Sequence, residues 1–181
     1  DNNQVIITPR YYSASASNTL TINIKDNGKL IAKKQVTQIE GLPIVIPVKK
    51  YQTWSPENPK LYDVTITSET DSVSDRIGFR TVATRGTEIL LNGKPIFCKG
   101  VSIHEEMPYS GSGRAYSEDH ARILLGWAKE MGCNFVRLAH YPHNEHMVRV
   151  AEEMGLMVWS EIPVYWTIRF ENPQTYANAE A

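Results

Sequence analysis

The chain has 181 residues, of which 41% are hydrophobic and 22% charged, and this composition excludes a disordered tail. Its 19 basic and 20 acidic residues give a net charge of −1, so the phosphate-neutralising surface of a nucleic-acid-binding protein is lacking. No apolar run approaches the roughly twenty residues that cross a bilayer. We therefore expect neither a nucleic-acid partner nor a membrane partner.

The opening stretch, DNNQVIITPR, lacks an initiator Met and the charged and apolar regions of a secretion signal. Such an opening is typical of the middle of a longer protein, and we expect a fragment. The compartment stays open, with a periplasmic or secreted parent protein as one alternative.

From Val5 to about Val82 the chain consists of short runs with a period of two residues, rich in Val, Ile and Thr. Turn-forming residues separate these runs, for example at Asp26–Lys29. Six such runs without a helical pattern predict an antiparallel β-sandwich.

After Gly86 the pattern changes. Residues 88–104 predict a hairpin followed by an apolar strand. A helix is expected next, with Ser117 as its N-cap and Gly132 as its stop. The apolar positions at helical spacing are Ile123, Leu124, Trp127, Ala128 and Met131.

The remaining segments alternate in the same way. Asn134–Tyr141 predicts a second apolar strand, Glu145–Gly155 a second helix ended by its glycine, and Leu156–Ile162 a third strand. This rhythm is typical of a parallel α/β structure. Two alternatives fit it: a small three-layer α/β domain, or the start of an eight-stranded barrel, whose typical length of about 250 residues exceeds this chain.

Two cysteines and two tryptophans are interpreted as structural. Cys98 and Cys133 lie in apolar runs and are expected to be reduced, buried thiols. Trp54 and Trp127 are expected in the core.

The segment from Gly132 to Met147 holds three histidines three residues apart. Their spacing resembles a metal site, but Pro142 interrupts the backbone and the H-E-x-x-H helix pattern is absent, so we expect no metal. His143 is expected in a loop and His146 in the first turn of a helix. Glu145 is explained by the dipole of that helix.

Five segments resemble, in order, glycoside hydrolase family 2, which includes β-galactosidases, β-glucuronidases and β-mannosidases. They are WSPENPKLY at Trp54–Tyr62, IGFRTV at Ile77–Val82, LNGKPIFCKGVSIHEEMP at Leu91–Pro108, NFVRLAHYP at Asn134–Pro142 and GLMVWSEIP at Gly155–Pro163. The resemblance implies an immunoglobulin-like β-sandwich in residues 1–83. Residues 84–181 would then form the first three β/α units of a truncated TIM (β/α)₈ barrel.

Side chains at the carboxyl ends of barrel strands face the substrate pocket. The resemblance therefore implies that His104, Arg137, His140 and Glu161 bind substrate. The alternative for Arg137 is an ion pair that holds barrel loops and orients active-site carboxylates. A lone histidine is more often structural.

Three aromatic residues close the same region of the sequence. Trp159, Tyr165 and Trp166 either present flat faces to a sugar ring or pack in the core.

The activity that the resemblance implies is retaining hydrolysis of a terminal β-linked sugar, without a cofactor. This reaction needs two carboxyl groups. In the family these groups follow the fourth and seventh barrel strands, so we expect no catalytic residue in this chain and no activity of the fragment itself.

Carbohydrate is thus the expected partner. A β-galactoside is favoured over a β-glucuronide because the sequence has no basic cluster beyond Arg137. Another family 2 glycosidase and a non-catalytic sandwich or scaffold module remain alternatives. A truncated barrel would leave an unpaired strand edge, and we expect the fragment to self-associate.

Overall fold

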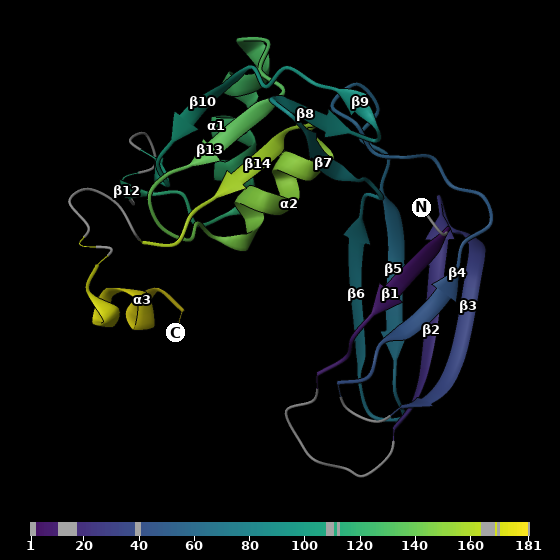
Figure 1. Ribbon diagram of the computed structural model, residues 1–181. Coiled ribbons are helices and arrows are strands. Elements are labelled where there is room, and N and C mark those ends of the chain that lie inside the picture. The colour runs from purple at the N-terminus through teal and green to yellow at the C-terminus, as the bar shows by residue number, and fades with distance from the viewer. Residues whose placement is uncertain are drawn as a thin grey trace. The chain divides into compact units, whose positions relative to one another are not determined.

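The computed structural model describes residues 3–10, 18–38, 41–107, 111, 113–163, 169 and 171–180 (Figure 1). Contacts within the chain divide it into two compact units. The first is Asp1–Trp54 with Lys60–Arg80, and the second is Ser55–Pro59 with Thr81–Ala181. Each unit has a hydrophobic core of its own.

The described residues of the first unit contain six strands. They are β1 (Gln4–Ile7), β2 (Asn18–Asp26), β3 (Lys29–Gln38), β4 (Ile44–Pro47), β5 (Tyr62–Thr67) and β6 (Ser72–Ile77). One sheet has the order β3-β2-β5-β6 and the other pairs β1 with β4, all antiparallel. The period of two in the sequence therefore predicts these strands correctly.

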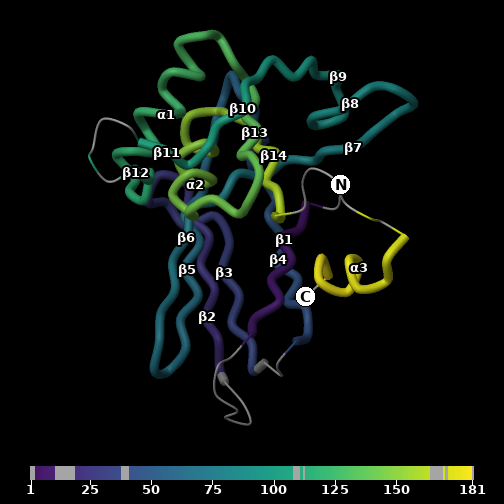
Figure 2. Tube along the Cα trace, turned by 90° about the vertical axis from the view of Figure 1, so that its left-hand side faces the viewer, coloured from purple at the N-terminus to yellow at the C-terminus, as the bar shows by residue number. Residues whose placement is uncertain are grey.

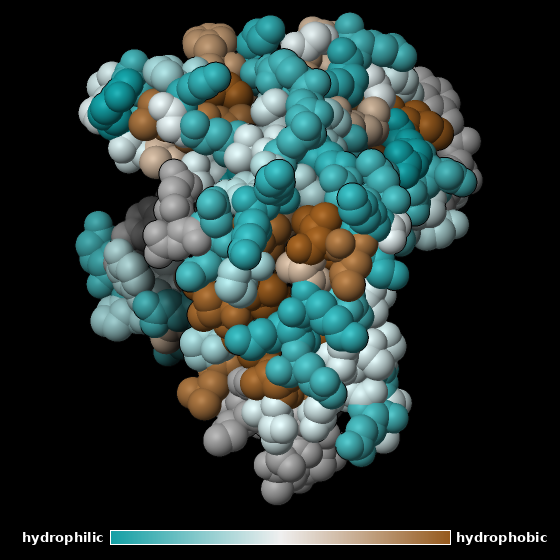
Figure 3. Space-filling model, turned by 90° about the vertical axis from the view of Figure 1, so that its right-hand side faces the viewer, coloured by the Kyte–Doolittle hydropathy of each residue, from teal (hydrophilic) through white to brown (hydrophobic). Residues whose placement is uncertain are grey.

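The alternation of side chains places every second residue in the core of this unit. On β2, for example, Leu20, Ile22 and Ile24 are buried, and residues of the neighbouring strand β5 and of β4 in the other sheet belong to the same core. Some apolar side chains also reach the surface, where Figure 3 shows them in brown. Ile6 and Val45 are direct cross-strand partners and are 63% and 38% exposed.

Trp54 is fully buried, as predicted. The guanidinium of Arg80 lies 4.4 Å from the centroid of its ring, which is a cation–π contact. A Cβ atom at Gly78 would lie 2.7 Å from Cδ1 of the indole. Position 78 therefore has room only for a residue without a side chain.

The second unit begins with antiparallel strands β7 (Val82–Arg85), β8 (Glu88–Leu91) and β9 (Lys94–Pro95). A short hairpin pairs β11 (Glu106–Met107) with β12 (Gly113–Arg114). The hairpin predicted within residues 88–104 corresponds to β8 and β9, whereas the sequence gives no signal for the β11–β12 hairpin.

A parallel sheet with the order β10-β13-β14 forms the centre of this unit. Its elements in chain order are β10 (Gly100–Ile103), α1 (Glu118–Glu130), β13 (Phe135–Leu138), α2 (Glu145–Glu153) and β14 (Met157–Ser160). Figure 2 shows the three strands side by side. The predicted strand–helix alternation is confirmed. A third helix, α3 (Pro173–Glu180), has no buried residue.

Both predicted helix boundaries of α1 are confirmed. The side chain of Ser117 accepts a hydrogen bond from the backbone N–H of His120, as an N-cap does. Gly132 follows the C-cap with a φ of +76°, and Gly155 follows the C-cap of α2 with a φ of +73°. A glycine in this left-handed conformation ends a helix without steric cost.

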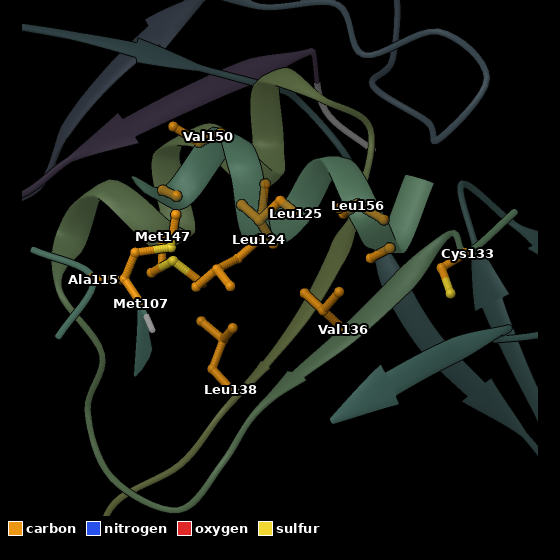
Figure 4. Packing of buried hydrophobic residues seen from close by; sticks show 13 residues of the cluster. Met107, Ala115, Leu124, Leu125, Cys133, Val136, Leu138, Met147, Val150 and Leu156 are labelled. Carbon is orange, nitrogen blue, oxygen red and sulfur yellow. The ribbon is translucent and has the colours of Figure 1, made fainter. Parts of the chain in front are cut away.

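The core of the second unit lies between the parallel sheet and the two helices (Figure 4). Val136 and Leu138 of β13 point toward the helices and are fully buried. On α1 the buried residues are Ala121, Leu124, Leu125 and Ala128.

The helical spacing is therefore right, but the predicted apolar face is partly wrong. Trp127 is 40% exposed rather than in the core, and Ile123 and Met131 are also exposed. Ile123 and Trp127 lie four residues apart on an exposed face of α1, and Met131, the C-cap of the helix, follows at the same interval. The two thiols are free, with Cys133 buried and Cys98 half-buried.

Candidate active site at the strand ends

The carboxyl ends of β10, β13 and β14 lie at one edge of the parallel sheet. Ser102, Arg137 and Trp159 are register partners on the three strands. Since Val136 and Leu138 point toward the helices, Arg137 lies on the opposite face. His104 and Glu161 directly follow β10 and β14. The predicted residues therefore reach the same edge from three strands.

Arg137, His140 and Glu161 form one hydrogen-bonded cluster. Nε of Arg137 donates to Oε1 of Glu161 over 2.6 Å. Nδ1 of His140 lies 3.1 Å from Oε2 of Glu161 and 3.3 Å from Nη2 of Arg137. A protonated Nδ1 donates to Glu161, whereas an unprotonated Nδ1 accepts from Arg137, so the tautomer selects the partner.

The charges in this cluster compensate one another. The Arg137 hydrogen bond, followed by that of His140, holds the pKa of the Glu161 carboxyl below its ordinary value of 4.5, against the opposing effect of desolvation. Glu161 is therefore an anion at neutral pH. Its side chain is 16% exposed, compared with 43% for Arg137 and 29% for His140, so polar groups of the cluster remain open to a ligand.

His104 joins the cluster through its ring. The ring centroids of His104 and His140 lie 5.4 Å apart, with an interplanar angle of 71°. The ring of Tyr141 is 6.0 Å from that of His104. The structure thus brings all four predicted site residues together.

The other histidines of the segment have different partners. Nε2 of His143 bonds to the carbonyl oxygen of Ala139 over 2.8 Å, and its ring stacks on Tyr141. His146 is exposed in the first turn of α2. Within the described ranges, no three His, Cys, Asp or Glu side chains gather in a way that could hold a metal ion.

Glu145 lies in the first turn of α2, as expected. Its side chain is 86% exposed, and Oε2 lies 3.5 Å from Nη2 of Arg149 one turn later. Asn144 caps the helix by accepting from the backbone N–H of His146. Glu145 is therefore a solvent-exposed residue of the first helical turn.

The aromatic candidates are only partly within the described chain. Trp159 is 60% exposed and is the register partner of Arg137. Tyr165 and Trp166 lie outside the described residues.

Sequence reasoning missed Glu105, which follows His104 directly. It is a buried charged residue, with a carboxylate that contacts Arg114 and the backbone of Asn144. In the sequence Glu105 and Glu106 are adjacent carboxylates, and no signal separates them. The structure buries Glu105 and exposes Glu106.

Comparison with known protein families identifies the family of this chain. A family profile described as "Glycosyl hydrolases family 2, TIM barrel domain" matches residues 82–178. A second, described as "Glycosyl hydrolases family 2", matches residues 4–80. The chain belongs to glycoside hydrolase family 2. Its first unit is the immunoglobulin-like part of such a protein, and its parallel sheet is part of the TIM barrel.

Relatives in the family have two different names. A putative β-glucuronidase of Formosa agariphila is 31% identical over 166 residues, which cover 80% of this chain and 20% of that protein. A β-galactosidase of an Arthrobacter species is 30% identical over 152 residues, covering 84% and 14%. The chain thus spans about a fifth or less of the length of these two relatives.

Solved structures show the same fold. The β-glucuronidase of Dictyoglomus thermophilum superimposes with a TM-score of 0.74 at 27% identity, covering 92% of this chain and 29% of that one. The Ruminococcus gnavus β-glucuronidase in complex with D-glucuronic acid gives a TM-score of 0.76 at 25% identity, covering 91% of this chain and 28% of that one.

Among the described residues of this family 2 chain, no helix is long and apolar enough to span a membrane.

Proposed function

We propose that this chain is part of a retaining exo-β-glycosidase and that the strand-end cluster contacts the sugar. The observation that carries the proposal is the convergence of His104, Arg137, His140 and Glu161 at the carboxyl edge of a family 2 barrel sheet. In TIM-barrel enzymes this edge holds the active site. Residues 84–181 are then the first three β/α units of the barrel, after a sandwich in residues 1–83.

Each of the four side chains has a distinct role in this proposal. The neutral imidazole of His104 can donate to one sugar hydroxyl and accept from another. His140 uses Nδ1 within the cluster, so its Nε2 either donates to a hydroxyl or accepts from one, according to the tautomer. Glu161 accepts from hydroxyl groups and holds Arg137 in place. The guanidinium keeps further N–H donors, which can orient a second carboxylate or a hydroxyl of the substrate.

The chemical step requires two more groups. In retaining hydrolysis one carboxylic acid protonates the leaving oxygen while a carboxylate roughly 5 to 5.5 Å away attacks the anomeric carbon. Glu161 is a poor acid here because Arg137 keeps its carboxyl ionised, and in family 2 both catalytic groups follow later barrel strands. We therefore assign both catalytic carboxyl groups to parts of the barrel beyond these residues, and we expect the 181-residue chain to be inactive.

The substrate is proposed to be a terminal β-galactoside. The positive charge of Arg137 is compensated by Glu161. It is therefore not available to pair with the carboxylate of a glucuronide. A β-glucuronide is the second candidate, because several similar proteins and solved structures are named β-glucuronidases.

A titration of the purified chain tests the binding role. D-galactose and D-glucuronic acid are added separately while NMR signals of the four side chains are followed. We expect shifts at these residues with one sugar, lost in Arg137→Gln and kept in Arg149→Gln, which removes the same charge from exposed α2. Unchanged signals with both sugars would contradict the proposed site and favour a scaffold module.

Hydrolysis assays test the expectation that the 181-residue chain is inactive. The chain should release no nitrophenol from p-nitrophenyl β-D-galactoside or β-D-glucuronide, whereas a longer protein that contains it should cleave one of the two. Release by the chain alone would show that its own carboxylates suffice.

A further inference from the structure

Among the described residues, Glu105 is the charged residue that the structure buries most completely. The residue is 2% exposed and its side chain 0%, although it lies between His104 and the exposed Glu106. A buried carboxylate is costly unless it is paired and fully hydrogen-bonded. The partners of Glu105 therefore show which parts of the molecule it holds together.

Its carboxylate joins two separate segments. Nε of Arg114, in the β11–β12 hairpin, lies 2.5 Å from Oε2. The backbone N–H of Asn144, the N-cap of α2, donates to Oε1. A negative charge at this end of a helix is favourable because the N–H groups there lack helical partners.

The backbone of Glu105 makes two further connections. Its N–H donates to the hydroxyl oxygen of Tyr141 over 3.3 Å, and its carbonyl oxygen accepts from the N–H of Ala115 over 3.2 Å. Tyr141 directly follows His140. Glu105 therefore links the segment after β10, which carries His104, to the segment after β13, which carries His140.

We infer that Glu105 is a positioning residue, which fixes His104 relative to His140 so that both rings face one ligand. The inference deepens the proposed function and rests on it for the ligand, but the ring geometry is independent of any sugar. The rings are 5.4 Å apart and belong to loops that follow different strands. Without the charge of Glu105, the hairpin and the start of α2 lose their common partner, and the His104 loop can move separately.

The matched variants are Glu105→Gln and Glu106→Gln. Both remove one negative charge at adjacent positions, but only the first alters the buried contact. The readout is the nuclear Overhauser effect between ring protons of His104 and His140 in the sugar-free chain. We expect this signal to be lost in Glu105→Gln and kept in Glu106→Gln, with the methyl signals of Val136 and Leu138 unchanged in both.

Tyr141→Phe provides a second variant should Glu105→Gln fail to fold. It keeps the ring and removes the oxygen that accepts from Glu105. It should weaken the same ring-to-ring signal while the core signals stay in place. A ring-to-ring signal that stays intact in the folded variants would overturn the inference and leave Glu105 a purely structural residue.

Sugar titration of the same variants separates the two proposals. Loss of ring contact together with loss of sugar-induced shifts supports both. Loss of ring contact in a chain that never responds to sugar supports the positioning role and contradicts the proposed binding function.

Discussion

At the scale of single residues, the cluster is organised by one carboxylate with two partners. Glu161 accepts from Arg137 and lies within hydrogen-bonding distance of His140, and these contacts cross from β14 to β13. Such an arrangement favours the ionised carboxyl in the folded state. It therefore makes the stability of the second unit depend on pH.

Replacing Glu161 by Gln should expose this dependence. Because the pKa of Glu161 is lowered by folding, its ionised form contributes stability that is fully present above the ordinary value of 4.5 and lost as the pH falls through the lower folded-state pKa. The difference in unfolding free energy between wild type and Glu161→Gln should be constant above pH 4.5 and shrink below it. Urea unfolding at a series of pH values measures this difference.

The same measurement in an Arg137→Gln background provides the control. Since Arg137 is the main cause of the lowered pKa, the pH-dependent part of the Glu161→Gln effect should become smaller there. An equal dependence in both backgrounds would assign the effect to another group.

At the scale of elements, the two helices end alike but in different surroundings. Gly132 and Gly155 both have left-handed backbone, at +76° and +73°. A Cβ atom at Gly132 would meet nothing within 4 Å, whereas one at Gly155 would clash with the carbonyl of Pro56. An alanine at position 132 therefore has only the cost of the left-handed conformation, whereas an alanine at position 155 also has a steric cost.

Gly132→Ala should lower the unfolding free energy by about 1–2 kcal/mol, the cost of a left-handed conformation for alanine. Gly155→Ala should lower it by more, because the Pro56 segment must also move. Urea midpoints of the two variants give the comparison. Equal losses would mean that the Ser55–Pro59 segment yields without cost.

The elements themselves were largely predictable. Periods of two and of about four residues, together with Ser117, Gly132 and Gly155, predict the strands, helices and their ends. The convergence of the four site residues also follows from strand order, once a parallel sheet is assumed.

Two features were beyond the sequence pattern. The partners of Glu105 are nine and thirty-nine residues away, on a hairpin and a helix start that local periodicity does not relate. The exposure of Trp127 was missed because α1 carries apolar residues on more than one face, and spacing alone does not show which face meets the sheet.

At the scale of the whole molecule, stability resides in two separate cores. Ile22 and Leu125 are both fully buried, one in each unit. Ile22→Ala and Leu125→Ala should each cost about 2–5 kcal/mol, as cavities in packed cores do. Unit-specific methyl NMR signals during urea unfolding should show each loss first in the unit that carries the change.

The exposed face of α1 bears on the expected self-association. Ile123 is 42% exposed and Met131 63%, on a helix whose opposite face is buried. We expect Ile123→Lys to reduce the concentration dependence of the apparent mass in light scattering. Glu130→Gln is the control because it makes the same change in charge at an exposed site of α1. A monomer at all concentrations would contradict the expected self-association.

The order β10-β13-β14 also predicts the rates of amide hydrogen–deuterium exchange along the three strands. The middle strand has a neighbour on each side, whereas each flanking strand has one in the described part of the sheet. Peptide N–H groups in a strand point alternately left and right. Isotope exchange along the flanking strands should thus proceed in a two-residue rhythm, fast then slow. Loss of this alternation on a flanking strand would indicate that a further strand pairs with it, either from the same polypeptide or from another copy.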